Sequence, residues 1–213
     1  MMIRKTILTA MVVACAAATA SAQEPRVELS GTAGWTFSDG VSGSASDSSV
    51  VRVDPKDAFS WGARLGFMVS PNIEVGGLFG MQKTDLEASG IVNRSVPQSI
   101  YNYHAYLAYN FGEADAKARP YVLGGLGATQ YGALKTSVGD IGGQTKFSST
   151  WALGLKLYPS RNVGIRLEGR WTPTYIKSDA AGYWCDPYWG CYTIADAQYA
   201  NQFELSGGIT LRF

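Results

Sequence analysis

Long hydrophobic runs, histidine and an excess of charge of one sign are all missing or scarce in this sequence. Beyond the N-terminal segment no stretch approaches 18 consecutive apolar residues, so no membrane-spanning helix is available. The 213 residues include 18 lysines and arginines against 17 aspartates and glutamates, and this balance argues against nucleic acid as a partner. With a single histidine and three cysteines, we expect neither a metal site nor a cofactor.

The N-terminus has the three parts of a secretory signal. Arg4 and Lys5 form a positive segment, residues 7–18 are apolar, and small residues at 20–22 form a cleavage site. We therefore predict a signal peptide over residues 1–22 and a mature domain over residues 23–213. One alternative stays open, in which Cys15 is lipidated after cleavage at a lipoprotein signal, although the apolar segment before it would be very short.

Alternation of apolar and polar residues with a period of two recurs throughout the mature chain and is clearest in its last twelve residues. This periodicity is typical of β-strands that separate an apolar phase from a polar one. The pattern is weakest where glycines are dense, after Pro120. Eight strands are predicted: Val27–Ser38, Ala58–Val69, Ile73–Lys83, Ile100–Phe111, Pro120–Tyr131, Phe147–Tyr158, Val163–Pro173 and Gln202–Phe213.

The connections between these strands alternate in length. Long loops are expected at 39–57, 84–99, 132–146 and 174–201, and shorter turns between the other strands; residues 38–49 show no periodicity and are interpreted as a flexible loop. An even strand number with this alternation is typical of bacterial outer-membrane barrels. We therefore predict an all-β fold, an eight-stranded antiparallel up-and-down transmembrane β-barrel with both chain ends on the periplasmic side.

Alternation alone does not decide which face of the barrel points outward, because a soluble lipocalin-like barrel has its apolar face inside. The positions of the aromatic residues along the strands favour a membrane barrel, with the apolar face outward, over a soluble one. Aromatic residues gather near the strand ends, as at Trp35, Trp61 and Phe213, whereas the strand centres carry aliphatic residues such as Leu107 and Leu155. Two aromatic girdles around an aliphatic band fit a bilayer.

The opposite face of the strands would then line the lumen, and it carries charges of both signs. Because an unpaired buried charge costs several kcal/mol, we expect these charges to form a paired network that plugs the lumen, which in an eight-stranded barrel is only wide enough for side chains. The alternative is a narrow conducting path gated by the same pairs. The residues of this network are Glu28, Arg64, Glu74, Lys156, Arg166, Glu168, Arg170, Glu204 and Arg212.

With its signal peptide, eight strands and terminal Leu211-Arg212-Phe213, the mature chain resembles the small outer-membrane barrel superfamily of the Gram-negative envelope. This superfamily includes opacity-type surface proteins and the transmembrane domain of OmpA. The resemblance implies that Phe213 belongs to a terminal signal read by the barrel-insertion machinery. It also implies contact with outer-membrane lipid and lipopolysaccharide, and a role in anchoring the envelope, adhesion, resistance to host defences or passage of small solutes.

Cys185 and Cys191 lie in the longest predicted loop, and two cysteines in an exported chain indicate a disulfide. The hairpin that carries this small closed loop displays Trp184, Tyr188 and Trp189. Exposed aromatic side chains on a constrained loop resemble binding hot spots for an extracellular ligand. The alternative is that they pack on the barrel rim or on lipid headgroups.

The single histidine, His104, is expected to face the lumen beside Asn102 and Tyr106. Outer-membrane lipid A acyltransferases and deacylases use a histidine, but the sequence has no local Ser–His motif here. We therefore predict a non-enzymatic surface protein that binds or shields through its loops. A narrow channel for small solutes is the second interpretation, and a lipid-modifying enzyme is the third.

Overall fold

The computed structural model describes residues 27–45, 50–89, 94–136, 139–176, 183–186, 190–193 and 199–213. The predicted signal peptide at 1–22, which includes Cys15, lies outside the described residues, as do Tyr188 and Trp189. In the described part of the chain, no helix is long and apolar enough to cross a membrane.

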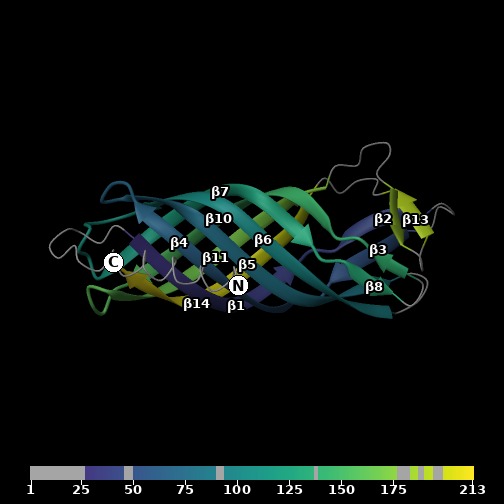
Figure 1. Ribbon diagram of the computed structural model, residues 1–213, viewed down its shortest axis with the longest axis horizontal. Coiled ribbons are helices and arrows are strands. Elements are labelled where there is room, and N and C mark those ends of the chain that lie inside the picture. The colour runs from purple at the N-terminus through teal and green to yellow at the C-terminus, as the bar shows by residue number, and fades with distance from the viewer. Residues whose placement is uncertain are drawn as a thin grey trace, which may run out of the picture.

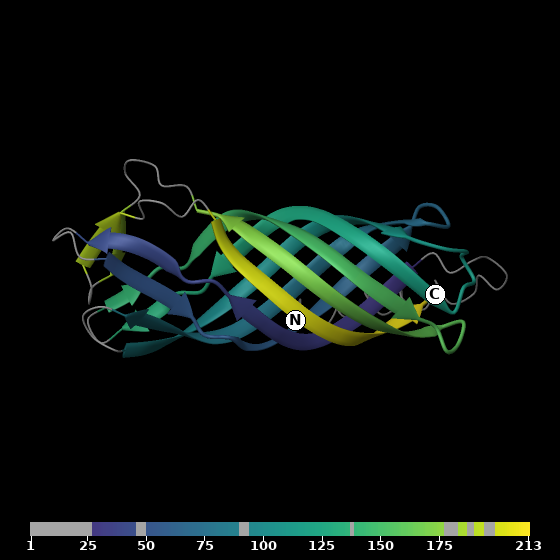
Figure 2. The same cartoon turned by 180° about the vertical axis from the view of Figure 1, so that it is seen from behind.

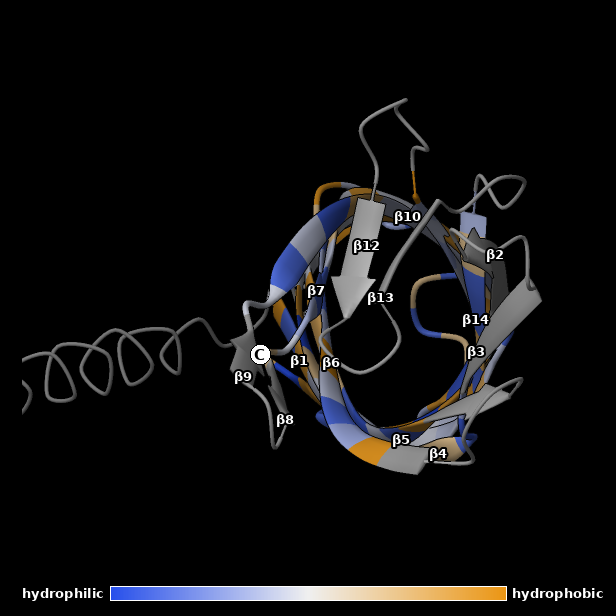
Figure 3. Cartoon of the chain, turned by 90° about the vertical axis from the view of Figure 1, so that its right-hand side faces the viewer, coloured by the Kyte–Doolittle hydropathy of each residue, from blue (hydrophilic) through white to orange (hydrophobic). Residues whose placement is uncertain are grey.

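Eight long strands form the wall of a closed antiparallel barrel (Figures 1 and 2). Each strand pairs with its neighbours along the chain, and β1 pairs with β14 to close the ring, which Figure 3 shows end-on. The strands are β1 (Val27–Ser38), β4 (Ala58–Met68), β5 (Ile73–Ser89), β6 (Arg94–Asn110), β7 (Ala118–Tyr131), β10 (Gln144–Leu157), β11 (Val163–Tyr175) and β14 (Tyr199–Arg212). The predicted eight-stranded barrel is therefore confirmed.

The two ends of the barrel differ. One end, here called the terminal end, holds Val27 and Phe213, whose backbones exchange hydrogen bonds of 3.0 and 3.2 Å. The connections at 69–72, 111–117 and 158–162 also lie there. At the opposite end, β-structure continues past the barrel wall, where Figure 1 shows β2 (Val41–Ala45), β3 (Val50–Pro55) and β13 (Gly190–Thr193). The predicted asymmetry between the two ends is thus present, but most of the connections at the second end contain strands.

The prediction of loops at 39–57 and 84–99 was wrong. β5 and β6 pair in continuous register from Ile73↔Tyr109 to Ala88↔Arg94, and β2 (Val41–Ala45) and β3 (Val50–Pro55) occupy the first connection. Outside an apolar phase both faces of a strand meet water, so backbone pairing no longer requires an alternating sequence. Short strands also occur in the other two long connections: β8 (Leu134–Thr136), β9 (Gly139–Ile141), β12 (Tyr183–Asp186) and β13 (Gly190–Thr193).

These additional strands build on the wall in a fixed order. The neighbours run β12-β13-β2-β3-β5, and β3 pairs with the upper part of β5 from Arg52↔Ser89 to Pro55↔Leu86. We call β2, β3, β12 and β13, together with residues 84–89 of β5 and 94–99 of β6, the extension. It is a sheet that rises from one end of the barrel wall.

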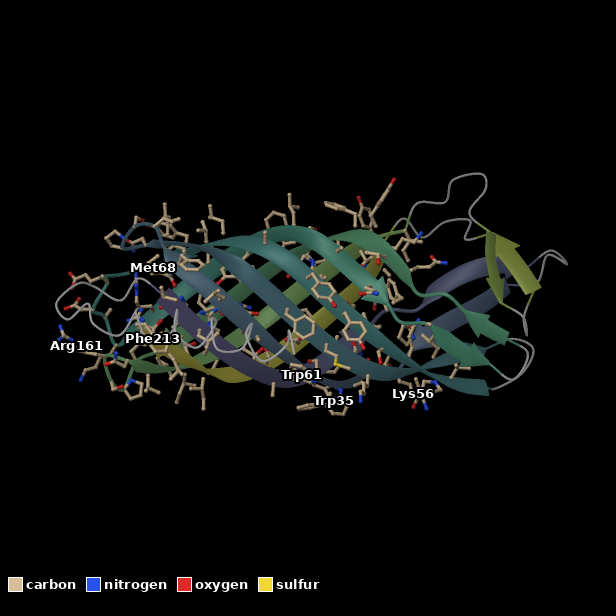
Figure 4. The ribbon with its side chains drawn as sticks, viewed as in Figure 1. Trp35, Lys56, Trp61, Met68, Arg161 and Phe213 are labelled. Atoms are coloured by element: carbon tan, nitrogen blue, oxygen red, sulfur yellow. The ribbon has the colours of Figure 1, made fainter. Side chains whose placement is uncertain are left out.

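The outer face of the barrel is an apolar belt. Its large exposed side chains include Leu65, Leu107 and Leu153, the last 67% exposed, and aromatic residues flank this aliphatic zone. Figure 4 shows Trp35 and Trp61 toward the extension and Phe213 at the terminal end. So continuous an apolar surface is incompatible with water on this face, and the aromatic girdles mark the two interfaces of a bilayer.

The girdle toward the extension is ordered by ring contacts and polar anchors. Phe79 packs edge-on to Trp61 at 5.6 Å between ring centroids and lies 5.4 Å from Tyr103. The indole of Trp171 donates a 3.2 Å hydrogen bond to Asn201 Oδ1. Such an arrangement suits an interface, because the ring is buried in lipid while its polar atom remains satisfied.

The free-energy cost of placing a charged side chain on this belt should therefore depend on its depth in the bilayer. Leu153→Arg, at the belt centre, is expected to lower the free energy of unfolding from lipid vesicles by about 2–4 kcal/mol, whereas Val163→Arg, at the terminal end of β11, should cost about 0–1 kcal/mol. Urea titrations of both variants, with Leu153→Ala as a size control, provide the measurement. Equal costs at the two positions would contradict the bilayer orientation.

Candidate functional site: the charged lumen

Among the residues that the structure describes, ten charged side chains are buried in the lumen. All nine members of the predicted network are among them, and the tenth is Arg119 on β7. Six are cationic and four are anionic, so the buried set carries a net charge of +2. They arise from seven different strands, because alternation places every second residue of each strand inward.

Glu28 is the centre of the cluster at the terminal end. Its carboxylate accepts a 2.7 Å hydrogen bond from Lys156 Nζ, a 2.9 Å bond from Arg212 Nε and a 3.3 Å bond from Arg166 Nη2. Tyr158 also donates to it at 2.8 Å, and the Arg212 guanidinium stacks on the ring of Tyr158. One carboxylate thus joins β1 to β10, β11 and β14, which lie around half of the wall.

Glu74 on β5 connects the opposite wall to the same cluster. Lys156 Nζ donates to Glu74 Oε2 at 2.5 Å, so one ammonium group bridges Glu28 and Glu74. Tyr106 donates a 2.6 Å hydrogen bond to the other oxygen of Glu74. Because the lysine crosses the lumen between β10 and the β1–β5 side, the interior at this level is filled by side chains.

At mid-height a bidentate pair spans the barrel. Arg64 on β4 donates from both terminal nitrogens to Glu168 on β11, at 2.8 and 2.7 Å. Tyr121 donates a third hydrogen bond to Glu168. Both partners of the pair are nearly inaccessible to solvent, and the parallel fork geometry is the strongest form of ion pair available to two side chains.

The lumen tyrosines fit because glycines face them. A Cβ atom on Gly154 would overlap the ring of Tyr121, and one on Gly66 or Gly76 would overlap the hydroxyl of Tyr106 or the carboxylate of Glu74. The two tyrosine rings belong to a small apolar cluster that excludes water from the ion pairs and so strengthens them. It comprises Leu78, Tyr106, Ala108, Tyr121, Leu123 and Ala152.

Toward the extension the lumen changes to mostly uncharged polar side chains. Arg170 donates to Glu204 at 2.5 Å, and this is the last ion pair on that side among the described residues. Above it, Gln202 on β14 donates to Gln82 on β5 at 3.2 Å and accepts from Asn102 on β6 at 3.4 Å. These amide bonds cross the lumen and close it at a second level.

His104 lies in this upper region and faces inward, as expected. Its Nε2 is 2.9 Å from Ser148 Oγ, which in turn is 3.0 Å from Thr129 Oγ1. No sequence pattern indicates this Ser–His pair, because the two residues are 44 positions apart and meet only through strand register. His104 Nδ1 has no hydrogen-bond partner among the described residues, so no carboxylate orients the ring there.

Arg119 is the lumen residue that sequence reasoning missed. It stands at the start of β7, where Pro120 and the glycines at 124, 125 and 127 obscure the alternation. The register settles its direction, since Arg119 lies directly opposite the lumen residue Lys156. The lumen therefore holds one more buried cation than the nine-residue network predicted from the sequence.

The remaining predicted positions lie at the two ends of the barrel. Phe213 is outward-facing and 52% exposed at the terminal end. In the β12–β13 hairpin the backbone places Cys185 opposite Cys191, with Trp184 on the same strand; the side chains there lie outside the described part, so the disulfide and the aromatic display remain predictions. No group of three metal-ligating side chains is found among the described residues.

A closed antiparallel barrel with an apolar outer belt and an ion-paired lumen defines a small transmembrane β-barrel. The model of the family described as outer membrane protein beta-barrel domain matches residues 6–209, and the chain belongs to this family. Membership in this family places the protein in the bacterial outer membrane.

Solved structures agree on the fold. Neisserial surface protein A is 15% identical to the chain, with a TM-score of 0.57 over 88% of this chain and 97% of its own. The outer membrane protein OprG from Pseudomonas aeruginosa is 12% identical, with a TM-score of 0.64 over 90% of this chain and 97% of its own. At these identities the likeness concerns the fold alone. No curated protein sequence matches the chain significantly.

Proposed function

We propose that this chain is a non-enzymatic surface protein of the bacterial outer membrane that binds or shields through its extension. The observation that carries the proposal is the length of β5 and β6, which are 17 residues each. A tilted strand needs only about 9–11 residues to span a bilayer. The surplus of about six residues per strand corresponds to roughly 20 Å of paired backbone beyond the membrane.

The base of the extension is held by specific contacts, which suits a binding surface. The Lys56 backbone N–H donates a 2.8 Å hydrogen bond to the Asp85 carbonyl, and the Thr84 hydroxyl donates to the Lys56 carbonyl. Asp57 accepts a 3.3 Å bond from the Ser38 backbone. Binding surfaces fixed on a rigid base lose less conformational entropy when a partner is bound.

The hairpin at the tip of the extension is the proposed contact region. Directly opposed cysteines on β12 and β13 support a Cys185–Cys191 disulfide. Such a bridge would hold Trp184, Tyr188 and Trp189 for an extracellular ligand.

The proposed orientation follows the family rule that long connections lie outside the cell. The terminal end then faces the periplasm, where Phe213 is exposed to the barrel-insertion machinery. The apolar belt contacts outer-membrane lipid and lipopolysaccharide. The competing role, a channel for small solutes, is disfavoured by three levels of side-chain bonds across the lumen, at Lys156, Arg64 and Gln202.

A trimmed variant distinguishes the surface role from the channel role. Lys83 and Ser99 lie directly opposite each other, so replacing residues 84–98 with Asn-Gly gives a two-residue hairpin of the preferred type. Four-residue Gly/Asn linkers in place of residues 39–57 and 177–198 remove β2, β3, β12 and β13; the second linker joins strands whose ends, Tyr175 and Tyr199, lie directly opposite each other. Cells displaying the full or the trimmed chain are then compared for adhesion to immobilised matrix proteins and sulfated glycans, and for survival in serum. The full chain is expected to act in at least one assay and the trimmed chain in none.

Planar-bilayer recordings on the same two proteins provide the control for a channel. Neither chain is expected to show discrete conductance steps, because the lumen network is retained in both. Equal behaviour of the two chains in every cell assay, combined with conductance from both, would replace the surface role with the channel.

The Ser148–His104 pair is the one observation that favours a lipid-modifying enzyme. Both side chains are almost fully buried inside the lumen, whereas an acylated substrate would approach from the lipid-facing wall. Mass spectrometry of lipid A from cells expressing the wild type, His104→Ala or Ser148→Ala is therefore expected to give identical species. A change in acylation that depends on either residue would reverse this conclusion.

A further inference from the structure

The lipid-facing wall over β10, β11 and β14 contains an open groove of about 610 Å³. These three strands lie side by side in Figure 2, where β14 is yellow. Glycines leave the hollow, and leucines surround it; Leu153 and Leu205 are 67% and 53% exposed. We call it the leucine groove and define it by Leu153, Leu155, Leu167, Gly169, Leu205 and Gly207.

The two glycines form one hollow because of strand register. Gly169 on β11 lies directly opposite Leu205 on β14, and Gly207 on β14 lies directly opposite Leu167 on β11. Glycine and leucine thus alternate both along and across the strand pair, and the two glycines are diagonal neighbours. The groove runs between the leucines and over the backbone of both strands.

In the described part of the chain, neither the backbone nor a close neighbour requires glycine at these two positions. Neither glycine has a positive φ. A Cβ atom on Gly169 would lie 3.6 Å from Leu205 Cδ2, and one on Gly207 would lie 3.5 Å from Leu167 Cδ2, which are ordinary contact distances. The lumen glycines differ, since a Cβ on Gly154 would overlap a tyrosine ring. Glycine weakens a strand interior and often marks a place where a ligand approaches closely.

The groove offers hydrocarbon contacts. β11 and β14 pair without a break from Val163↔Leu211 to Tyr175↔Tyr199, so the backbone hydrogen-bonding groups of the floor are used by the sheet. Glu168 also borders the groove, but its carboxylate lies in the lumen, where Arg64 binds it. Inside a bilayer, van der Waals packing is a main source of selective association between apolar groups. Such a groove therefore suits a flexible apolar chain.

The groove begins directly below the aromatic girdle on the extension side. Trp151 lies directly opposite Trp171, and Trp171 lies directly opposite Phe203; these are the next outward-facing residues toward the extension on the three strands. Toward the terminal end, Ile165 and Ile209 continue the aliphatic surface. In the proposed orientation, the girdle above the groove faces the outer leaflet, which lipopolysaccharide forms.

We propose that the leucine groove holds one acyl chain of lipid A, the hydrocarbon anchor of lipopolysaccharide, in preference to the chains of other lipids. The chain lies over Gly169 and Gly207, where it contacts the strand backbone as well as the surrounding leucine side chains. Dispersion energy grows with the number of atoms in contact, and a hollow offers more of them than a convex wall. The choice of lipid A over phospholipid rests on the orientation given under the proposed function.

The first test is native mass spectrometry of the folded mature chain, released from detergent micelles after incubation with hexa-acylated lipid A. The wild type is expected to retain one lipid A per chain. Gly169→Leu/Gly207→Leu, which fills the groove, should lower the lipid-bound fraction at least fivefold. Gly77→Leu on β5 is the matched control, because Gly77 is also exposed with open space around it but lies outside the groove, and it should leave the fraction unchanged.

Three results would overturn the proposal. The first is equal retention of lipid A by the wild type and the filled variant. The second is equal retention of phosphatidylethanolamine and lipid A by the wild type. The third is a dimer that the filled variant loses, which would assign the groove to a second copy of the chain. The orientation is tested separately by protease treatment of intact cells: cleavage in the extension confirms it whatever the lipid result.

A measurement on the wild type alone keeps the proposal testable if the filled variant does not fold. In lipid vesicles, electron spin resonance of a phospholipid labelled near its chain end counts the motionally restricted lipids around each barrel. Unlabelled lipid A is expected to lower this count more than an equal amount of unlabelled phosphatidylethanolamine does. Equal displacement by the two lipids would overturn the proposal.

Discussion

The cost of burying charge is the constraint on which this structure depends. The outer face of the barrel is fixed by lipid, so every second residue of each strand must point into a narrow interior. Charges placed there are costly unless they are paired. Glu28 and Glu74 share Lys156, and Arg64 forms a fork with Glu168. The same contacts that cancel the burial cost also connect strands far apart around the ring, and they leave the lumen filled.

The outer and inner faces of the barrel have different roles. The apolar belt holds the barrel in the membrane but does not indicate a particular function, because outside the leucine groove lipid contacts its apolar surface equally. The lumen gives rigidity. Function is therefore expected where neither constraint applies, in the extension, where β3 pairs with the upper part of β5 beyond the belt. A rigid barrel that carries a raised sheet is suited to presenting a surface outside the cell.

The sequence was sufficient for the parts of the fold in which the membrane imposes a pattern. The bounds of β1 followed from parity alone, and the inward direction of Glu28 and Arg64 followed from parity together with the positions of the aromatic residues along the strands. The extension was missed because strands in water need no alternation, and Arg119 was missed because neighbouring glycines carry no side chain to mark a face. The Ser148–His104 contact and the fit of Tyr121 against Gly154 depend on register between distant strands, which periodicity within one strand does not contain.

The most direct measurement of the central claim is a double-mutant cycle on Arg64 and Glu168. Unfolding free energies are measured in lipid vesicles for the wild type, Arg64→Met, Glu168→Gln and the double variant. Each single change leaves a buried charge or its hydrogen-bond donors without a partner and is expected to lower the free energy of unfolding by about 3–5 kcal/mol. The double variant should lose far less than the sum of the two single losses. Effects that add to within about 0.5 kcal/mol would mean that the two residues are not coupled, and pairing would then not be what offsets the cost of burying these charges.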